Sequence, residues 1–416
     1  MSGRRTAATT PVLRRMTAEA VLGALVSSGE LNANDLMTAT GLSRPTVHSV
    51  CDELIALGWV VETGAATGAS EATAEGVAPG PGRSGRPSRR YSLNAGAAFV
   101  AGVDLGATKV TCCLADLKGR IVVERTEGWR DEHVGAPERL RTTRKLLQEL
   151  LQEAGIDPLK VLSCGMAVPA PVTSDGRAVA LESYLPGLAA LDLRESLQPD
   201  LSWPVLAEND ANLAVLAERW LGVARDVDNV VVLLAGERLG AGICLGGRLI
   251  RGGGAAGEMR FLELVEGVGN TDAVGGMCRE LGAVAAAEII AGERDEDPDA
   301  SALVVLSGGN PGGMTAEIVV EAARRGDPAA VEVITLVMER TARVAAVVST
   351  LLDPELLVLA GGPAGAGDVL LPALEHQLHR LNSARPRLAA STLGDHSALV
   401  GAVRLALDHA FEGLLD

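Results

Sequence analysis

An acidic hairpin is the first segment of this chain that could act on a phosphate. Asp104 ends an apolar run over 99–104, and Thr108 and Lys109 follow in a turn that also contains glycine. An acid at a strand end can hold Mg²⁺ through water, and a Gly/Thr turn can offer backbone N–H groups to phosphate oxygens. Many plain hairpins have the same composition. A phosphate site and an ordinary turn before a strand over 110–115 therefore both stay open.

A second segment, residues 43–57, has the spacing of a DNA recognition helix. Its apolar side chains recur at helical intervals and predict a buried face made of Val47, Val50 or Cys51, Leu54 and Leu57. The polar side chains left to face the major groove are Ser43, Arg44, Thr46, His48 and Ser49. No partner stands at ligand spacing from His48, so we interpret it as an exposed polar contact rather than a metal ligand.

A helix-turn-helix with a β-wing would hold that recognition helix in place. The expected elements are a helix over 12–28, a helix over 34–40, the recognition helix, and strands over 59–62 and 91–93. Asn32 or Asn34 is expected to cap the second helix. Ser43 is expected to cap the third, whose first turn accepts Pro45 because a missing N–H costs nothing there. This order of elements is typical of a winged helix.

The two strands of the wing are separated by an insert. Residues 64–82 are rich in alanine, glycine, serine and proline and have no apolar periodicity, so we expect a mobile segment. Four arginines follow within eight residues, namely Arg83, Arg86, Arg89 and Arg90. Beside a helix-turn-helix, Arg83 and Arg86 are predicted to reach DNA phosphates or the minor groove. The alternative is a basic loop that only increases solubility.

The bulk composition limits the class of protein. A chain of 416 residues is long enough for about two to four compact units. The formal net charge of −16 excludes a chain that coats nucleic acid along its length, but not one local basic patch. The six cysteines form no CxxC pair, which indicates neither a disulfide framework nor a zinc ribbon and fits a reducing compartment. Without a signal-peptide core or an apolar run of about 20 residues, we expect a soluble cytoplasmic protein.

Several short motifs in the body occur in the order typical of one family. They are Asp104–Lys109, Gly165–Val172, Leu185–Gly187, Glu208–Asn212, Gly254–Glu258 and Leu359–Gly362. In this order they resemble the ROK family of bacterial repressors and sugar kinases. The front module resembles the winged helix of the repressor branch of that family. The resemblance covers nearly the whole chain except residues 64–82.

The resemblance implies a fold in two parts. Residues 1–95 would form an N-terminal winged helix-turn-helix, and the remainder a two-lobed α/β actin-like (ribonuclease H-like) ATPase or sugar-kinase fold. The first lobe would combine residues 96–207 with 395–416, and the second would be 208–394. A sugar would bind in the cleft between the two lobes.

The resemblance also implies roles for polar residues of the body. Those carried over are Asn209, Asp210 and Glu258 on the sugar side and Asp104, Thr108 and Lys109 on the phosphate side. In the kinases of the family, the acid at the position of Asp210 takes the proton from the sugar hydroxyl. Asn209 and Glu258 would hydrogen-bond sugar hydroxyls. The plainer interpretation of this motif is the capped start of a helix over 211–220, because Asn and Asp are good caps.

The second phosphate loop departs from the kinases of the family, where it reads Gly-Thr-Gly-Ile-Gly. Here it is Gly236-Glu237-Arg238-Leu239-Gly240. A carboxylate about 4 Å from a phosphate charge costs roughly 4 kcal/mol at an effective dielectric near 20, which Arg238 could partly offset. The lost glycine is the stronger argument, because the side chain of Arg238 obstructs a backbone that must close on the phosphates. We therefore expect no nucleotide cofactor and no kinase activity, with the phosphate-side residues as remnants.

A second departure concerns zinc. Members of the family often carry a zinc-binding His after the Gly-Glu pair and a Cys-rich loop beyond it. Phe261 occupies that His position, and Cys278 is the one thiol in the region that follows. A single thiol cannot complete a tetrahedral site, so we predict no metal. Tyr184 stands where many members have Asn, and it could stack on a sugar face or simply fill the cleft.

Three functions fit these residues. The leading hypothesis is a transcriptional regulator, expected to be a repressor, that binds operator DNA as a homodimer or tetramer and responds to a sugar or sugar-derived effector. The second is an ATP-dependent sugar kinase that also carries a DNA-binding module. The third is a DNA-binding regulator that acts independently of any ligand.

Overall fold

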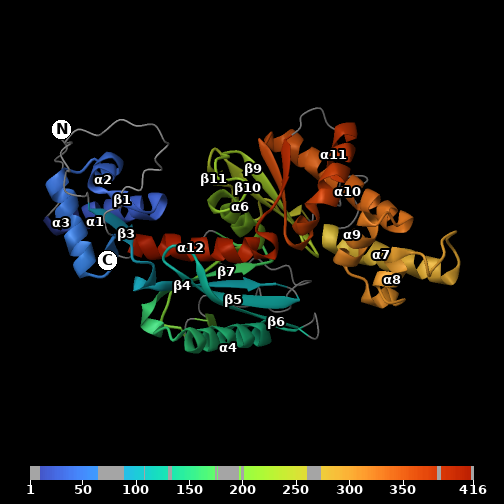
Figure 1. Cartoon of the computed structure of the whole chain (residues 1–416), viewed down its shortest axis with the longest axis horizontal. Coiled ribbons are helices and arrows are strands. Elements are labelled where there is room, and N and C mark those ends of the chain that lie inside the picture. The colour runs from blue at the N-terminus through green and yellow to red at the C-terminus, as the bar shows by residue number, and fades with distance from the viewer. Residues whose placement is uncertain are drawn as a thin grey trace, which may run out of the picture.

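Three β-sheets organise the part of the chain that the computed structural model describes (Figure 1). That part comprises residues 10–63, 89–106, 108–129, 134–173, 176, 196–197, 201–259, 273–381 and 386–413. The smallest sheet belongs to an N-terminal module of helices, and the two larger sheets belong to an α/β body. The predicted architecture, a winged helix followed by a two-lobed α/β body, is confirmed.

The N-terminal module has the expected order of helices and strands. Its elements are α1 (Thr10–Ser28), β1 (Leu31–Asn32), α2 (Ala33–Thr40), α3 (Arg44–Ala56), β2 (Val60–Thr63) and β3 (Arg90–Leu93). Of the two predicted caps for α2, Asn32 is the one used: its side chain accepts from Asp35 N, and Asp35 accepts from Asn32 N in return. Ser43 caps α3 by accepting from Thr46 N, as predicted. The short strand β1 was not predicted; it pairs with β3 and makes a three-stranded wing in the order β1-β3-β2.

One predicted core position of the recognition helix is wrong. Val47, Val50, Cys51 and Leu54 are buried as expected, but Leu57 is 60% exposed. The reason is that α3 ends at Ala56 and Leu57 is its C-cap residue. Beyond that point the chain turns at Gly58, so the helical spacing that would have carried Leu57 to the core no longer holds.

The first large sheet has the strand order β6-β5-β4-β7-β8. These strands are β4 (Phe99–Leu105), β5 (Lys109–Asp116), β6 (Ile121–Gly128), β7 (Val161–Val168) and β8 (Val205–Asn209). The helix α4 (Ala136–Ala154) covers one face, and α12 (Ser397–Gly413) lies on the other (Figure 1). Strands β4, β7 and β8 are parallel neighbours, so their carboxyl ends meet at one edge of the sheet.

The second large sheet has the order β11-β10-β9-β12-β13. Its strands are β9 (Val230–Ala235), β10 (Leu239–Leu245), β11 (Arg248–Leu249), β12 (Leu356–Ala360) and β13 (Arg387–Ala390). One face packs on α6 (Asp210–Trp220), and the other packs on a group of helices in a large aliphatic core. These helices are α7 (Val274–Ala291), α8 (Ala302–Leu306), α9 (Ala316–Arg324), α10 (Pro328–Leu352) and α11 (Gly367–Leu381).

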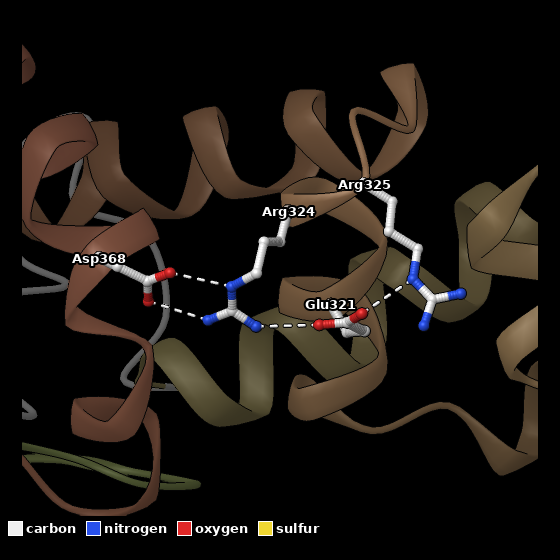
Figure 2. A network of polar contacts seen from close by, with 4 residues as sticks. All are labelled: Glu321, Arg324, Arg325 and Asp368. Atoms are coloured by element: carbon white, nitrogen blue, oxygen red, sulfur yellow. Dashed lines mark hydrogen bonds and ion pairs between the residues drawn. The ribbon is translucent and has the colours of Figure 1, made fainter.

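Charged side chains fasten two of those helices to each other on the outside. Arg324 of α9 donates from Nε and Nη2 to the two carboxylate oxygens of Asp368 on α11, at 2.9 and 2.8 Å (Figure 2). Its third nitrogen donates to Glu321, which also accepts from Arg325. Because all four side chains are exposed or half-exposed, this network fixes the orientation of α11 on α9 more than it stabilises the fold.

The helices α6 and α12 lie between the two large sheets and touch backbone to backbone. A Cβ at Gly401 of α12 would come within 2.1 Å of Leu213 O in α6. A Cβ at Gly165 of β7 would come within 2.0 Å of Ala402 O in α12. Likewise, a Cβ at Gly242 of β10 would come within 2.0 Å of Ala211 O in α6. Glycine at these three positions therefore lets the first sheet, α12, α6 and the second sheet stack without gaps.

The N-terminal module is not separated from the body. Buried residues of the module, including Leu25, Leu54 and Tyr91, belong to one hydrophobic cluster with Leu117 of the first sheet and Val403 of α12. Figure 1 shows the end of α12 reaching the module. Within the described residues, no helix is long and apolar enough to cross a membrane.

Candidate effector and DNA sites

Asp210, predicted for the sugar side, and Asp104, predicted for the phosphate side, lie at the edge where the parallel strands end. Asp104 is near the end of β4, and Asp210 begins α6 directly after β8. Burial raises the pKa of Asp210 to about 7, and the negative charges of Asp104 and Glu258 add to that rise. Burial also raises the pKa of Asp104 to about 6, against the opposing effect of the Lys109 ammonium. The structure therefore brings Asp104, Asp210 and Glu258 within electrostatic reach of one another.

Both polar atoms of the Asn209 side chain make a hydrogen bond within the protein. Its Oδ1 accepts from Asn212 N at 3.1 Å and so caps α6, and its Nδ2 donates to Ala170 O at 3.1 Å. The cap that the plainer interpretation predicted is thus present. It does not exclude a sugar contact, because an amide oxygen has a second lone pair. The same two bonds hold the Asn209 side chain in one orientation beside Asp210.

An ion pair between the buried Glu208 and the exposed Arg251, next to this motif, was not predicted. Glu208 is 5% exposed and accepts from Arg251 Nε at 2.5 Å, from Asn212 Nδ2 at 3.0 Å and from Asn209 N at 2.9 Å. Arg251 stands at the start of the loop that leads to Glu258. The pair therefore ties the Glu258 loop to the start of α6. The acidic residue Glu208 at the start of the Glu208-Asn209-Asp210 motif could have suggested a basic partner. No rule of sequence spacing, however, identifies a partner 43 residues away.

Glycine positions Glu258 itself. Gly257 has a φ of +82°, and a Cβ there would lie 1.8 Å from Ala241 O of β10. Gly257 O accepts from Ala241 N at 2.9 Å, so the loop is pinned to the second sheet. Glu258 is half-buried directly after this contact. A residue other than glycine at 257 would push Glu258 away from the site.

On the phosphate side, charged residues of the body are paired with each other. Lys109 Nζ donates to Asp395 Oδ2 at 3.2 Å, and Thr108 before it is exposed. Asp395 also lies against the backbone of Gly362, because a Cβ at that glycine would come within 2.8 Å of Asp395 Oδ1. The Lys109–Asp395 pair thus joins the first hairpin to the segment before α12 at the position where the resemblance places a nucleotide.

The altered loop is held by α7. Glu237 accepts from Arg279 of α7 at 3.0 Å. Gly236 O accepts from Gly275 N at 3.0 Å, and Glu237 O accepts from Ala273 N at 3.2 Å. Backbone N–H groups at a helix N-terminus are the usual donors to phosphate. Here carbonyl oxygens of the loop accept from two such N–H groups, those of Ala273 and Gly275, and so join the loop to α7.

The zinc positions fall partly outside the described residues. Phe261 and Tyr184 lie there, so the predictions made for them stay predictions. Cys278 is fully buried in α7, within the core of the second sheet. In the described part of the chain, no three His, Cys, Asp or Glu side chains lie close enough to hold a metal ion.

The predicted DNA-contacting residues are unequally available. Ser43, Arg44 and Ser49 are exposed at the start of α3, and Thr46 is half-buried. The interpretation of His48 as a free, exposed contact is wrong: it is half-buried, and its Nδ1 lies 2.8 Å from Tyr91 Oη of β3. The wing strand passes behind α3, which sequence spacing alone could not show.

The basic flank of the wing insert also differs in part from expectation. Arg83 and Arg86 lie outside the described residues. Arg89 donates to Asp52 of α3 at 2.8 Å and to Glu62 of β2 at 2.9 Å, while Arg90 is paired with Glu30. Two of the four arginines therefore stabilise the module rather than present free charge to DNA.

Comparison with known proteins identifies the two parts. A sequence profile of the ROK family matches residues 100–409, and a profile of the MarR family matches residues 20–69. The chain is 22% identical to the xylose repressor of Caldicellulosiruptor bescii over 95% of this chain and 96% of that protein. It is 28% identical to the glucokinase of Thermotoga maritima over 67% of this chain and 86% of that protein.

Two solved structures share the fold. A ROK family transcriptional regulator, a homologue of the E. coli Mlc protein, superimposes with a TM-score of 0.72 at 23% identity, covering 97% of this chain and 98% of that one. A ROK family glucokinase from Streptomyces griseus, in complex with glucose and AMPPNP, gives 0.62 at 26% identity, covering 74% of this chain and 99% of that one. The part that the kinase lacks is the N-terminal module. With the family profile matching about three quarters of its length, this chain belongs to the ROK family.

Proposed function

We propose that this protein is a sugar-responsive transcriptional repressor whose winged helix binds operator DNA. The observation that carries the proposal is the joining of two parts: an N-terminal winged helix with Arg44 exposed at the start of α3, and a ROK body that shares one hydrophobic cluster with it. Its full-length likeness to a xylose repressor supports the same function. Because DNA-reading dimers match paired half-sites, we propose that it acts as a homodimer or higher oligomer.

The effector site is proposed around Asn209, Asp210 and Glu258. A carboxyl with a pKa of about 7, such as Asp210, both donates and accepts hydrogen bonds near neutral pH. When it is ionised, Glu258 acts purely as an acceptor, and Asn209 has a spare lone pair on Oδ1. Alternating donors and acceptors of this kind suit a ligand with several hydroxyl groups. A monosaccharide is therefore the effector class we propose.

We further propose that the body does not transfer phosphate. Support comes from the two internal ion pairs at the nucleotide position, Lys109 with Asp395 and Glu237 with Arg279. A bound triphosphate would have to replace both pairs. It would also have to compete with loop carbonyl oxygens for the N–H groups of Ala273 and Gly275.

One observation favours the rival function, an ATP-dependent sugar kinase. Asp210, with a pKa of about 7, is suited to accept a proton from a sugar hydroxyl near neutral pH. Assay of ADP release with a panel of hexoses, pentoses and amino sugars distinguishes the two functions. We expect no turnover above background. Turnover that disappears in Asp210→Asn, with the binding of sugar retained, would establish the kinase instead.

The repressor function is tested with the full chain and DNA. Sites are selected from random duplexes, and fluorescence anisotropy then measures affinity with and without D-xylose or D-glucose. We expect sequence-selective binding that Arg44→Ala weakens by about tenfold, since a side chain that contacts a base edge contributes about 1–3 kcal/mol. Arg141→Ala, an exposed arginine on α4, is the matched control and should leave affinity unchanged. Binding without sequence preference, or equal loss in both variants, would contradict the proposal.

A further inference from the structure

The helix α6 spans the distance between the effector site and the base of the N-terminal module. Asp210 is its first residue and Trp220 its last. Its 11 residues extend about 16 Å at 1.5 Å per residue. Backbone contacts with Gly242 on one side and Gly401 on the other leave it no room to bend. A shift of its first turn therefore has to appear at Trp220.

Trp220 rests on a tight turn of the first sheet. The turn between β5 and β6 contains Gly119, with a φ of +77°, and a Cβ there would lie 2.1 Å from the Trp220 ring. The indole thus lies directly on the backbone of Gly119. On its other side, the guanidinium of Arg404 from α12 stands 5.5 Å from the ring centre. Trp220 therefore contacts both the turn and α12.

The same turn is bonded to the wing. Asp116 Oδ1 accepts from Lys118 N and Arg120 N, at 2.8 and 3.0 Å, which fixes the turn. Lys118 Nζ donates to Ser92 Oγ of β3 at 2.8 Å. Next to it, Leu117 N donates to Ala95 O at 3.1 Å. Ser92 is 5% exposed, whereas Lys118 is an exposed residue, so an exposed lysine of the turn reaches a buried hydroxyl of the wing.

The wing strand β3 then leads to the recognition helix. Neighbouring residues of a strand point to opposite faces. Ser92 faces the body through Lys118, and Tyr91 faces α3, where its hydroxyl lies 2.8 Å from His48 Nδ1. Arg89 adds an ion pair to Asp52 of α3. The strand therefore holds the body through one residue and the recognition helix through its neighbours.

We propose that Trp220 and Lys118 are positioning residues that transmit the state of the effector site to the recognition helix. The path is α6, the Gly119 turn, β3 and α3. The inference rests on the proposed function, because it names how that function is regulated. A ligand that draws Asp210 and Glu258 together shifts α6, the indole displaces the turn, and Lys118 carries the displacement to the wing. Trp220 ends α6 and Lys118 lies in the β5–β6 turn, away from the proposed effector residues and from α3, so both act on the coupling between the two sites.

The test measures coupling rather than either affinity. Operator affinity of the full chain is determined with and without saturating D-xylose or D-glucose. The ratio of the operator affinity without sugar to the operator affinity with sugar is the coupling factor. We expect a wild-type factor of about 5 to 150, the usual range for allosteric proteins. Trp220→Ala and Lys118→Met should each lower it at least about threefold, while the affinity for sugar in calorimetry stays unchanged. Trp220→Phe and Lys118→Arg, which keep a ring and a donor, should restore most of it.

The controls separate positioning from stability. Lys160→Met removes an exposed lysine in the 3-10 turn before β7 and should leave the coupling factor at its wild-type value. Thermal unfolding of Lys118→Met should match that of Lys160→Met, which a purely structural role of Lys118 would not allow. If the wild type responds to sugar and both Trp220→Ala and Lys118→Met show the wild-type coupling factor, the inference is overturned and the repressor function stands. If the wild type shows no sequence-selective DNA binding or no sugar response, the proposed function fails and the inference with it.

Discussion

Replacing Asp210 with asparagine should raise the free energy of unfolding near neutral and alkaline pH, and should have no such effect at acidic pH. The pKa of Asp210 is about 7 in the folded protein against an ordinary value of 3.8, because burial and the nearby Asp104 and Glu258 carboxylates disfavour its charge. The unfolded chain ionises at the ordinary value. Between these two pH values the unfolded state has lost a proton that the folded state still holds, so stability falls as pH rises. An asparagine has no such dependence, and its Oδ1 can still accept the bond from Ala211 N.

The size of the effect follows from the same two pKa values. A carboxyl shielded completely would weaken folding by about 4 kcal/mol at any pH above 7. Asp210 keeps some contact with solvent, so we expect Asp210→Asn to gain about 2–4 kcal/mol there. The gain should shrink as pH falls from about 7 to about 4 and vanish below both pKa values. The midpoint of that change should lie between the folded and unfolded pKa of Asp210.

Urea unfolding at a series of pH values measures this directly. The matched control is Asp157→Asn, an exposed aspartate that also accepts from a backbone N–H, that of Leu159. It should show no pH-dependent gain. A difference between Asp210→Asn and wild type that is constant with pH would refute the reasoning. So would a loss of stability near pH 8, because it would mean that the Asp210 carboxylate is ionised and favourably paired in the folded protein.

Three further predictions concern single contacts. Ser43→Ala removes the cap of α3 and should cost about 1 kcal/mol in urea unfolding, whereas Ser49→Ala, which makes no cap, should cost little. Gly165→Ala places a methyl group 2.0 Å from Ala402 O and should cost about 3 kcal/mol or prevent accumulation of folded protein. Gly96→Ala, with open space around it, is the comparison, and equal stability of the two would contradict the packing argument. Arg251→Met leaves the buried Glu208 without its cation and should cost about 2 kcal/mol and weaken sugar binding in calorimetry.

Local chemistry made the elements predictable from sequence. Asn32 and Ser43 precede helices as caps, and both caps are formed. The helix over Pro328–Leu352 also has local end signals, because Asp327 and Pro328 begin it and Asp353 ends it in a left-handed conformation. The order of short motifs implied the two-lobed body.

Long-range pairing explains what could not be predicted. His48 has the spacing of an exposed residue on α3, and only the pairing of β3 with β2 and β1 brings Tyr91 behind it. Arg89 looked like free positive charge because its two carboxylate partners are 27 and 37 residues away. The Glu208–Arg251 pair spans 43 residues and two elements. Such contacts depend on how strands are ordered, which periodicity does not encode.

The substituted loop explains why a kinase fold can serve as a sensor. A kinase must leave its phosphate-binding backbone free until the nucleotide arrives. Here Glu237 and Lys109 are held by partners within the chain, from α7 and from the segment before α12 respectively. Both ion pairs form within the chain itself, so the phosphate side of the body is ordered without a bound nucleotide. What remains free to change is the site around Asp210, whose negative charge is disfavoured by the carboxylates of Asp104 and Glu258. A ligand that satisfies these carboxyls would act directly on the first turn of α6, the element whose other end touches the support of the wing.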